Sequence, residues 1–152
     1  MFLTGRTQVV HIKQSFSDPL EVISGVIQGS VIGPLLFLLY IDDMITTTSR
    51  ETKVSLFADD AKVYARNPKI LQSDINAICQ FLDKRQLQLA PEKCQQITIS
   101  KSSDKQDFYI GNHIVPHSAV VKDLGVTVSE NLRWKEHINS IKLKASRRCN
   151  TY

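Results

Sequence analysis

The sequence is poor in the features that mark several large classes of protein. Its cysteines, Cys79, Cys94 and Cys149, form an odd and scattered set, which argues against a disulfide framework. No histidine stands at metal-ligand spacing from them, so no zinc site is indicated. The longest apolar run, residues 31–41, is interrupted by glycine and proline and falls well short of the roughly 20 residues that cross a bilayer. We interpret that run as a helix of the protein core.

The sequence also lacks low-complexity tracts and internal repeats. Its 152 residues carry a formal net charge of +4 with an isoelectric point near 9.0, which permits an anionic partner such as nucleic acid without requiring one. With 42% hydrophobic and 22% charged residues, the composition is typical of one globular domain rather than of a disordered chain. Residues 1–10 contain no signal-peptide core. We therefore expect an intracellular protein, nuclear or cytoplasmic and not secreted, with no membrane contact.

Turn signals and β-branched residues define the first elements. Residues 8–12 and 20–24 predict an antiparallel hairpin that turns at Ser17-Asp18-Pro19. The glycine-rich loop 25–34 then leads into a helix that begins at Pro34. Because this helix is apolar all round, we expect it to be buried.

The rest of the chain continues to mix strands and helices. Asn67 and Pro68 are a good cap and first residue for a helix. The apolar face of that helix is predicted to hold Leu71, Ile75, Ile78 and Leu82. Further strands are predicted at residues 54–58, 61–65, 97–100, 108–115 and 120–128. A last helix places Trp134, Ile138, Ile141 and Ala145 on one face. This order predicts the α+β class.

Two adjacent carboxylates, Asp59 and Asp60, fall between two of these strands in the stretch LFADDAKVYA. Side chains alternate along a strand, so neighbouring aspartates reach a common region only at a tight turn. Carboxylates are good ligands for Mg²⁺, and two such ions roughly 3.5–4 Å apart stabilise the entering and leaving oxygens of a phosphoryl displacement. Aspartate is also common in ordinary turns, because its side chain bonds nearby backbone. The pair lacks the glycine or asparagine that tight hairpins favour, which argues against that second interpretation.

Four segments, in order along the chain, together indicate a family. LFADDAKVYA contains the motif Phe/Tyr-x-Asp-Asp, and SGVIQGSVIGPLLFLLYIDDM at residues 24–44 is similar to the pattern Ser-Gly-Val-Pro-Gln-Gly-Ser-x-Leu-Gly-Pro. LQLAPEKC at residues 87–94 and DLGVTVSENLRWKEHI at residues 123–138 follow. In this order they resemble the reverse transcriptases of non-LTR retrotransposons, where the last segment is the primer-grip strand and the entry to the thumb. The strongest single match is QGSVIGPLLF.

The resemblance implies roles for individual residues. Asp59 would be the principal metal ligand and Asp60 its lesser partner, for two Mg²⁺ ions in the complete enzyme. Gln28 and Gly29 would lie against the incoming nucleotide and the template base. Lys93 would assist the departure of pyrophosphate as a proton donor; a solvated surface lysine is the alternative.

The resemblance also implies contacts with nucleic acid. Leu124 and Gly125 would hold the primer end. The last helix carries far more basic than acidic residues, and four of them are expected to contact duplex phosphates: Lys142, Lys144, Arg147 and Arg148. A merely solvated face is the alternative. The implied partners are an RNA template, a DNA primer, deoxynucleoside triphosphates and the rest of the retrotransposon polyprotein.

Several positions depart from the family pattern. Ile27 stands where the family usually has proline, which loosens a loop that must be preorganised. Ala90 stands for the usual asparagine and loses a turn-forming side chain before Lys93. Asp42 replaces a common asparagine and Ala61 a common threonine. The family's first catalytic strand, with its own metal-binding aspartate, precedes the segment that matches the start of this chain, so we expect that strand and the fingers to be absent.

The expected fold is therefore α+β: a partial right-hand polymerase palm, an antiparallel sheet with packed helices, over residues 1–115. The primer-grip strand and the start of a helical thumb would occupy residues 116–152. The expected function is that of a fragment of an RNA-directed DNA polymerase that extends a primer by two-metal nucleotidyl transfer and is inactive in isolation. The alternative is a catalytically dead retrotransposon remnant that at most binds nucleic acid or protein. A viral RNA-dependent polymerase matches less well, because its motif usually has glycine at the position of Ala58.

Overall fold

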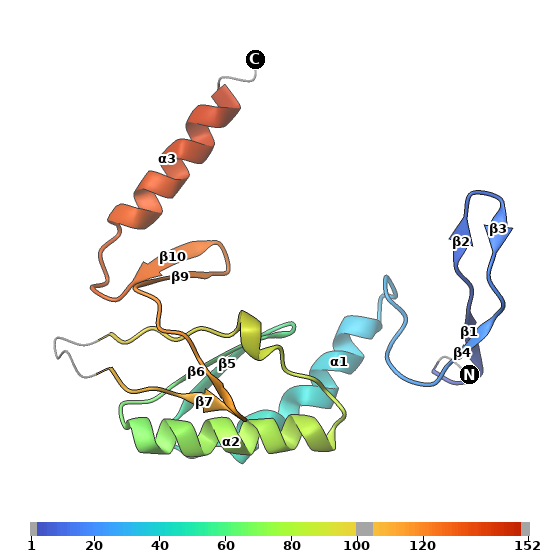
Figure 1. Ribbon diagram of the computed structural model, residues 1–152, viewed down its shortest axis with the longest axis horizontal. Coiled ribbons are helices and arrows are strands. Elements are labelled where there is room, and N and C mark those ends of the chain that lie inside the picture. Colours follow the sequence, from blue (N-terminus) through green and yellow to red (C-terminus); the bar gives the residue numbers. More distant parts are fainter. Residues whose placement is uncertain (1–2, 100–104, 150–152) are drawn as a thin grey trace. The chain divides into compact units, whose positions relative to one another are not determined.

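The computed structural model describes residues 3–99 and 105–149 (Figure 1). The chain forms two compact units, one made of Met1–Thr46 and Val54–Lys62, the other of Thr47–Lys53 and Val63–Tyr152. Helices and small two-stranded sheets alternate along the sequence. The predicted α+β class is confirmed.

The elements are short, apart from two of the helices. The α-helices are α1 (Gly33–Ile41), α2 (Pro68–Lys84) and α3 (Lys135–Cys149), and the 3₁₀ helices are η1 (Asp42–Thr47) and η2 (Pro91–Lys93). The strands are β1 (Arg6–Gln8), β2 (His11–Ile12), β3 (Ser15–Phe16), β4 (Leu20–Val22), β5 (Lys53–Phe57), β6 (Asp60–Tyr64), β7 (Tyr109–Ile110), β8 (His113–Ile114), β9 (Val120–Asp123) and β10 (Val126–Ser129). Within the described ranges the strands form five two-stranded sheets: β1–β4, β2–β3, β5–β6, β7–β8 and β9–β10. None of the helices in the described ranges has both the length and the apolar character that a membrane crossing needs.

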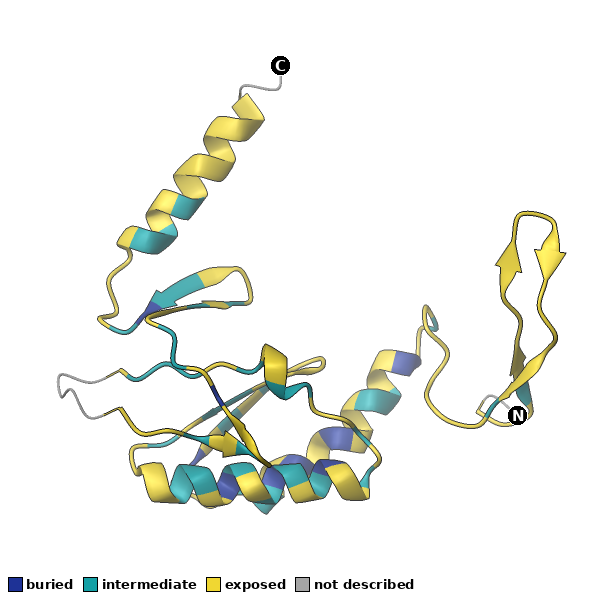
Figure 2. Ribbon diagram, in the orientation of Figure 1, coloured by how far each residue is buried: buried dark blue, intermediate teal, exposed yellow. Residues whose placement is uncertain are grey.

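The N-terminal hairpin has a different turn from the one predicted. β1 pairs antiparallel with β4 and β2 with β3, so the chain reverses at Lys13, whose φ is 55°, and Gln14. The predicted turn at Ser17-Asp18-Pro19 is wrong, because Ser17 belongs to the ladder. Its N–H donates to Val10 O at 2.9 Å, and its hydroxyl accepts from Val10 N at 3.0 Å. The hairpin is exposed along most of its length (Figure 2).

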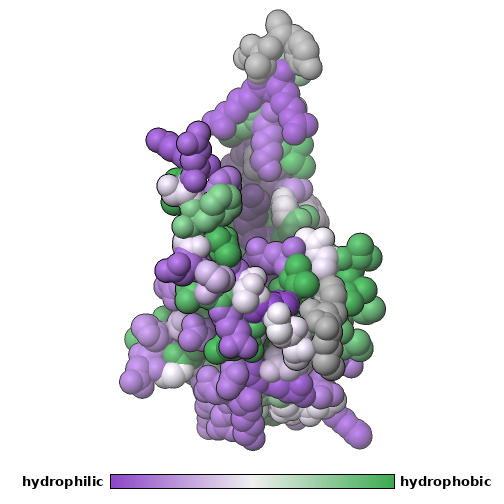
Figure 3. Space-filling view, turned by 90° about the vertical axis from the view of Figure 1, so that its right-hand side faces the viewer, coloured by the Kyte–Doolittle hydropathy of each residue, from purple (hydrophilic) through white to green (hydrophobic). Residues whose placement is uncertain are grey.

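Helix α1 begins as predicted, with Pro34 in its first turn. Ile41 at its end and Met44 in η1 are buried, at 5% and 3% exposure. The expectation of a wholly buried helix is wrong, because Leu35 and Leu39 are 57% and 65% exposed. The described residues give this all-apolar helix too few neighbours to cover every side. Figure 3 shows hydrophobic and hydrophilic side chains mixed over one face of the molecule.

Helix α2 follows the sequence prediction closely. Asn67 caps it, since its Oδ1 accepts from Lys69 N at 3.0 Å, and Pro68 opens the first turn. Ile78 and Leu82 on its apolar face are buried, at 6% and 9% exposure. The Gln72 side chain holds β7 against this helix: Tyr109 N donates to Gln72 Oε1 at 2.8 Å and Gln72 Nε2 donates to Tyr109 O at 2.9 Å.

The predicted strands downstream of α2 are only partly present. Residues 108–115 and 120–128 do not form single strands; each folds back as a hairpin, β7–β8 and β9–β10. Both contain a glycine with positive φ at the turn, Gly111 and Gly125, and such glycines allow a tight reversal. Residues 97–99 form no strand, and Ser100 of that prediction lies outside the described residues.

Candidate active site

The Asp pair lies at the sharp reversal between β5 and β6. Ala58 and Asp59 form the connection, and Asp60 is the first residue of β6, so the predicted strands 54–58 and 61–65 each begin one residue too late. A two-residue connection joins antiparallel strands. Ala58 has a φ of 51° and Asp59 has none in the positive range, which is the pattern of a type II′ turn.

The two carboxylates are available for a ligand. Both residues are exposed. Neither side chain makes a hydrogen bond or ion pair within the described residues. The strained backbone of Ala58 costs on the order of 1–2 kcal/mol, because a Cβ crowds the carbonyl in this conformation. A strained turn with two exposed carboxylates is a candidate site for a metal ion.

The glycine-rich loop, residues 25–34, is a second candidate binding segment in the same compact unit. Ser30 N donates to Ile27 O at 3.2 Å, which closes a turn with Gln28 and Gly29 at its centre. Gly29 has a φ of 79°, as the third position of a type II turn requires. Gln28 and Gly29 are both exposed at the tip of this turn.

The loop is fastened to the start of α1 by one hydroxyl. Ser30 Oγ donates to Ile27 O at 2.7 Å and accepts from Gly33 N at 3.0 Å. A Cβ on Gly33 would lie 2.7 Å from Ser30 Oγ and 3.2 Å from Ile27 O, so this position has no room for a side chain. The sequence did not indicate a packing role for Gly33. The loop is thus locally ordered even though Ile27 replaces the usual proline.

Lys93 and the tip of the β9–β10 hairpin lie in the other compact unit. Lys93 ends η2 with an exposed side chain, and its N–H donates to Ala90 O at 2.9 Å. Leu124 and Gly125 form the hairpin turn with φ values of 46° and 90°, the pattern of a type I′ turn. Leucine is costly in that conformation, and Leu124 is nevertheless half exposed at 51%. Local stability does not explain a leucine there.

The basic residues of α3 also belong to this second unit. No described residue of α3 is buried. Lys142, Lys144, Arg147 and Arg148 are all exposed, as a contact with nucleic acid requires.

The donor set around the Asp pair fits Mg²⁺ only in part. Carboxylate oxygens suit this ion, which also keeps waters and binds substrate phosphates. Within the described ranges no three histidine, cysteine, aspartate or glutamate side chains come together. The thiols of Cys79 and Cys94 belong to the other compact unit. Burial raises the pKa of both, helped by the charges of Asp83 and Glu92 respectively, so both thiols remain protonated and are poor metal ligands.

One buried carboxylate was missed by the sequence reasoning. Asp74 in α2 is 6% exposed and accepts hydrogen bonds from Ser49. The signal was present, since Asp74 falls three residues after Leu71 and four before Ile78, on the apolar face of the helix. A charged residue on such a face is buried only when it is paired or hydrogen-bonded.

Comparison with known proteins identifies the family. The model of the family described as Reverse transcriptase (RNA-dependent DNA polymerase) matches residues 3–131. The RNA-directed DNA polymerase from mobile element jockey of Drosophila melanogaster is 27% identical over 153 residues, which cover 92% of this chain and 17% of the relative. The jockey polymerase of Drosophila funebris is 27% identical over 132 residues, covering 78% of this chain and 14% of the relative.

A third relative gives the same picture. The probable RNA-directed DNA polymerase from transposon X-element of Drosophila melanogaster is 26% identical over 153 residues, covering 94% of this chain and 17% of that protein. No solved structure matches the chain. The chain thus spans less than a fifth of the length of these curated relatives. The resemblance to the polymerases of non-LTR retrotransposons is confirmed, and the chain belongs to the reverse transcriptase family.

Proposed function

We propose that this chain is part of an RNA-directed DNA polymerase and supplies two of the carboxylates at which a primer is extended. The observation that carries the proposal is the β5–β6 turn, which presents Asp59 and Asp60 side by side and exposed in a reverse transcriptase chain. Residues 1–115 would be part of the palm. Residues 116–152 would be the primer-grip strand and the start of the thumb.

Asp59 and Asp60 would hold Mg²⁺ in the complete enzyme. Bound there, the ion would stabilise the negative charge that develops on the phosphate oxygens during nucleotidyl transfer. Asp59 lies in the turn itself and Asp60 begins a strand, so the two side chains start from different backbone conformations. We assign the principal role to Asp59. Two carboxylates are too few to organise two ions, so a further ligand from a longer protein is required.

The remaining candidate residues act on the substrates. The Gln28-Gly29 turn offers a backbone without a side chain at its tip, against which a flat base can lie, and a side-chain amide that can bond to it. Leu124 and Gly125 would support the primer end. Lys93 would donate a proton to the leaving pyrophosphate. The substrates are an RNA template, a DNA primer and deoxynucleoside triphosphates.

A second candidate function is that of an inactive remnant that binds nucleic acid or protein. It is favoured by the incomplete ligand set among the described residues and by Ile27 in the glycine-rich loop. The two functions differ in one property, which is recovery of synthesis when the rest of a polymerase is supplied.

The experiment is primer extension on a primed RNA template. The chain alone should give no synthesis. A fusion that places the preceding fingers and first palm strand of a closely related element before residue 1 should give Mg²⁺-dependent synthesis. Synthesis by the chain alone would show that no ligand is missing. A folded, RNA-binding fusion with no synthesis would favour the remnant.

A further inference from the structure

Helix α3 carries a narrow apolar stripe that nothing in the described residues covers. Trp134 precedes the helix, and Ile138, Ile141 and Ala145 follow at spacings of four, three and four. Trp134 and Ile138 are 61% and 59% exposed, and Ile141 is exposed as well. Over less than two heptads, this spacing fits the a and d positions of helices that pack along their length, and the next d position is Arg148. The stripe is narrower than the face by which a helix enters a globular core.

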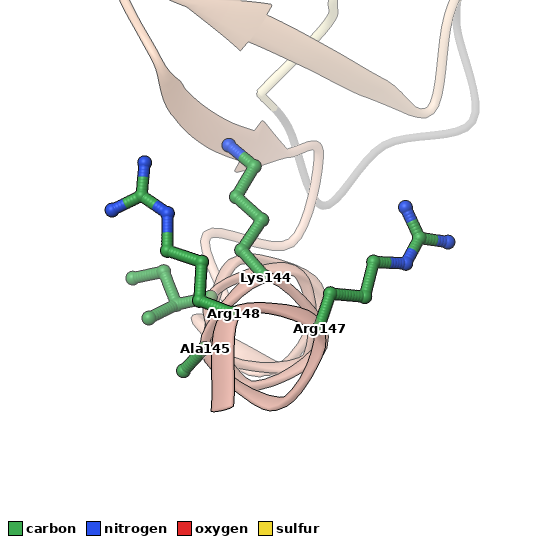
Figure 4. A pocket seen from close by; sticks show the side chains of 5 residues that line it. Lys144, Ala145, Arg147 and Arg148 are labelled. Atoms are coloured by element: carbon green, nitrogen blue, oxygen red, sulfur yellow. The ribbon is translucent and has the colours of Figure 1, made fainter. Parts of the chain in front are cut away.

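The surface of α3 is hollowed along this stripe. An open depression of about 470 Å³ is lined by Ile141, Lys144, Ala145, Arg147 and Arg148. Figure 4 shows Ala145 and Arg148 on one side of the helix, with Arg147 extending from the other. Four of the lining residues, 141, 144, 145 and 148, are related by i+3 and i+4 steps, so they surround one point of the helix surface. Four residues in this arrangement form the hole that receives a side chain from a facing helix.

The charges beside the stripe define the facing helix. With Ile138 and Ala145 at a and Ile141 at d, Lys135 and Lys142 fall at e and Lys144 falls at g. These positions determine partner choice, because their side chains meet those of the partner across the seam. A second copy of α3 would place cations against cations. A helix with glutamate or aspartate at e and g would place anions there.

Within the described residues no helix meets this requirement. Helix α1 carries no charged residue, and the apolar face of α2 is occupied by its own core through Ile78 and Leu82. We propose that the α3 seam, defined as Trp134, Ile138, Ile141 and Ala145 with its flanking lysines, binds an acidic amphipathic helix. This proposal does not depend on polymerase activity.

Two other surfaces fit the seam less well. Nucleic acid would compete with the partner helix for Lys142 and Lys144, but its contacts with these cations leave the apolar stripe uncovered. A helix that lies on a membrane presents a broad apolar face, whereas the opposite side of α3 carries another exposed apolar residue, Leu143. A partner helix accounts for the stripe, the hole and the flanking charges together.

The sole tryptophan of the chain reports on the seam directly. The full chain is titrated with a synthetic helical peptide that has leucine at a and d and glutamate at e and g. Trp134 emission should move to shorter wavelength and saturate. A peptide with lysine at e and g should produce no shift in Trp134 emission. Added salt should weaken the binding of the glutamate peptide, because it screens the opposite charges.

Matched variants test the face. Ile138→Lys and Ile141→Lys should each weaken binding roughly tenfold or more, because each removes buried apolar contact. Leu143→Lys is the control, since Leu143 is 62% exposed against 59% for Ile138 but lies on the opposite side of the helix. Circular dichroism should show equal helix content in all three. Equal losses in all three variants, or equal binding of the lysine peptide, would overturn the proposal. So would a Trp134 shift with duplex RNA or anionic phosphatidylserine vesicles and none with the glutamate peptide.

Discussion

The Asp74 carboxylate accepts two hydrogen bonds from Ser49, one from Oγ at 2.7 Å and one from the backbone N–H at 3.1 Å. Ser49 begins a turn that Thr52 N closes by donating to Ser49 O at 3.2 Å, and β5 starts at the next residue, Lys53. The buried carboxylate of Asp74 therefore fastens the turn before β5 to helix α2.

Replacing Asp74 should loosen this turn and remove a pH dependence. Burial by itself raises the pKa of Asp74, but the hydrogen bonds from Ser49, with Thr52 beside them, bring it below the ordinary value of 3.8. Because the folded pKa is the lower one, the contribution is complete above about pH 3.8 and is lost as the pH falls through the folded value. Asp74→Asn should cost about 1–3 kcal/mol of local stability, since it leaves a donor without its acceptor.

Amide hydrogen exchange at Ser49 measures this. Exchange should be faster in Asp74→Asn and unchanged in Asp83→Asn, an exposed position of the same helix. In the unmodified chain, protection should persist to below pH 3.8. Loss of protection near pH 5 would contradict the assignment.

Ala58→Gly should stabilise the β5–β6 hairpin by roughly 1 kcal/mol, because glycine adopts positive φ without strain. The same change at Ala61, which lies in β6, should destabilise it by about 0.5–1 kcal/mol. Cross-strand amide exchange in the two variants gives the comparison. Destabilisation by Ala58→Gly would mean that the turn is not strained as described.

Leu124→Asn separates stability from function at the β9–β10 turn. Asparagine followed by glycine is the preferred pair of a type I′ turn, so the hairpin should become more stable by a few tenths to 1 kcal/mol. If Leu124 supports the primer end, the active fusion should nevertheless extend primers less efficiently. A variant that is both more stable and fully active would remove Leu124 from the site.

Nucleic acid binding by the chain should be weak, indifferent to sequence and strongly dependent on salt. Charge reversal of Lys142, Lys144, Arg147 and Arg148 together should remove most of it and flatten the salt slope. Reversal of Lys13, Lys69, Lys84 and Lys122 changes the net charge equally at exposed positions outside α3 and should have a smaller effect. Equal loss in both variants would show that only the overall charge matters.

The sequence allowed reliable predictions where one local rule decides the conformation. Asn67 and Pro68 begin α2 by capping chemistry alone, and the apolar face of α2 follows from its period. Turn-forming residue types gave a wrong prediction for the N-terminal hairpin. Ser17 was assigned to the turn, but it bonds to Val10 within the ladder. The prediction of one strand at residues 120–128 was also wrong. The turn there begins at Leu124, and leucine is not a residue type that indicates a turn at positive φ.

The candidate site shows the same division. The turn at Asp59 followed from its place between two predicted strands, and the structure shows a tight reversal there. The glycines predicted a loop at residues 25–34, and the structure adds the turn at Gln28 and Gly29 within it. The exposure of α1 did not follow, because burial depends on neighbours that the pattern of one helix does not specify. Asp74 was overlooked since its partner, Ser49, lies 25 residues away in the sequence.

The most direct test of whether Asp59 and Asp60 form the catalytic site is primer extension by the active fusion carrying Asp59→Asn. A neutral amide is a poorer ligand for Mg²⁺ than a carboxylate, so Mg²⁺-dependent synthesis should be lost while RNA binding and helix content are kept. Asp60→Asn should reduce synthesis less. Asp42→Asn is the matched control, because it makes the same change at an exposed aspartate outside the β5–β6 turn, and it should leave synthesis unchanged. Undiminished synthesis by the Asp59→Asn fusion would contradict the catalytic role of Asp59 and would leave the two aspartates as residues of an ordinary hairpin turn.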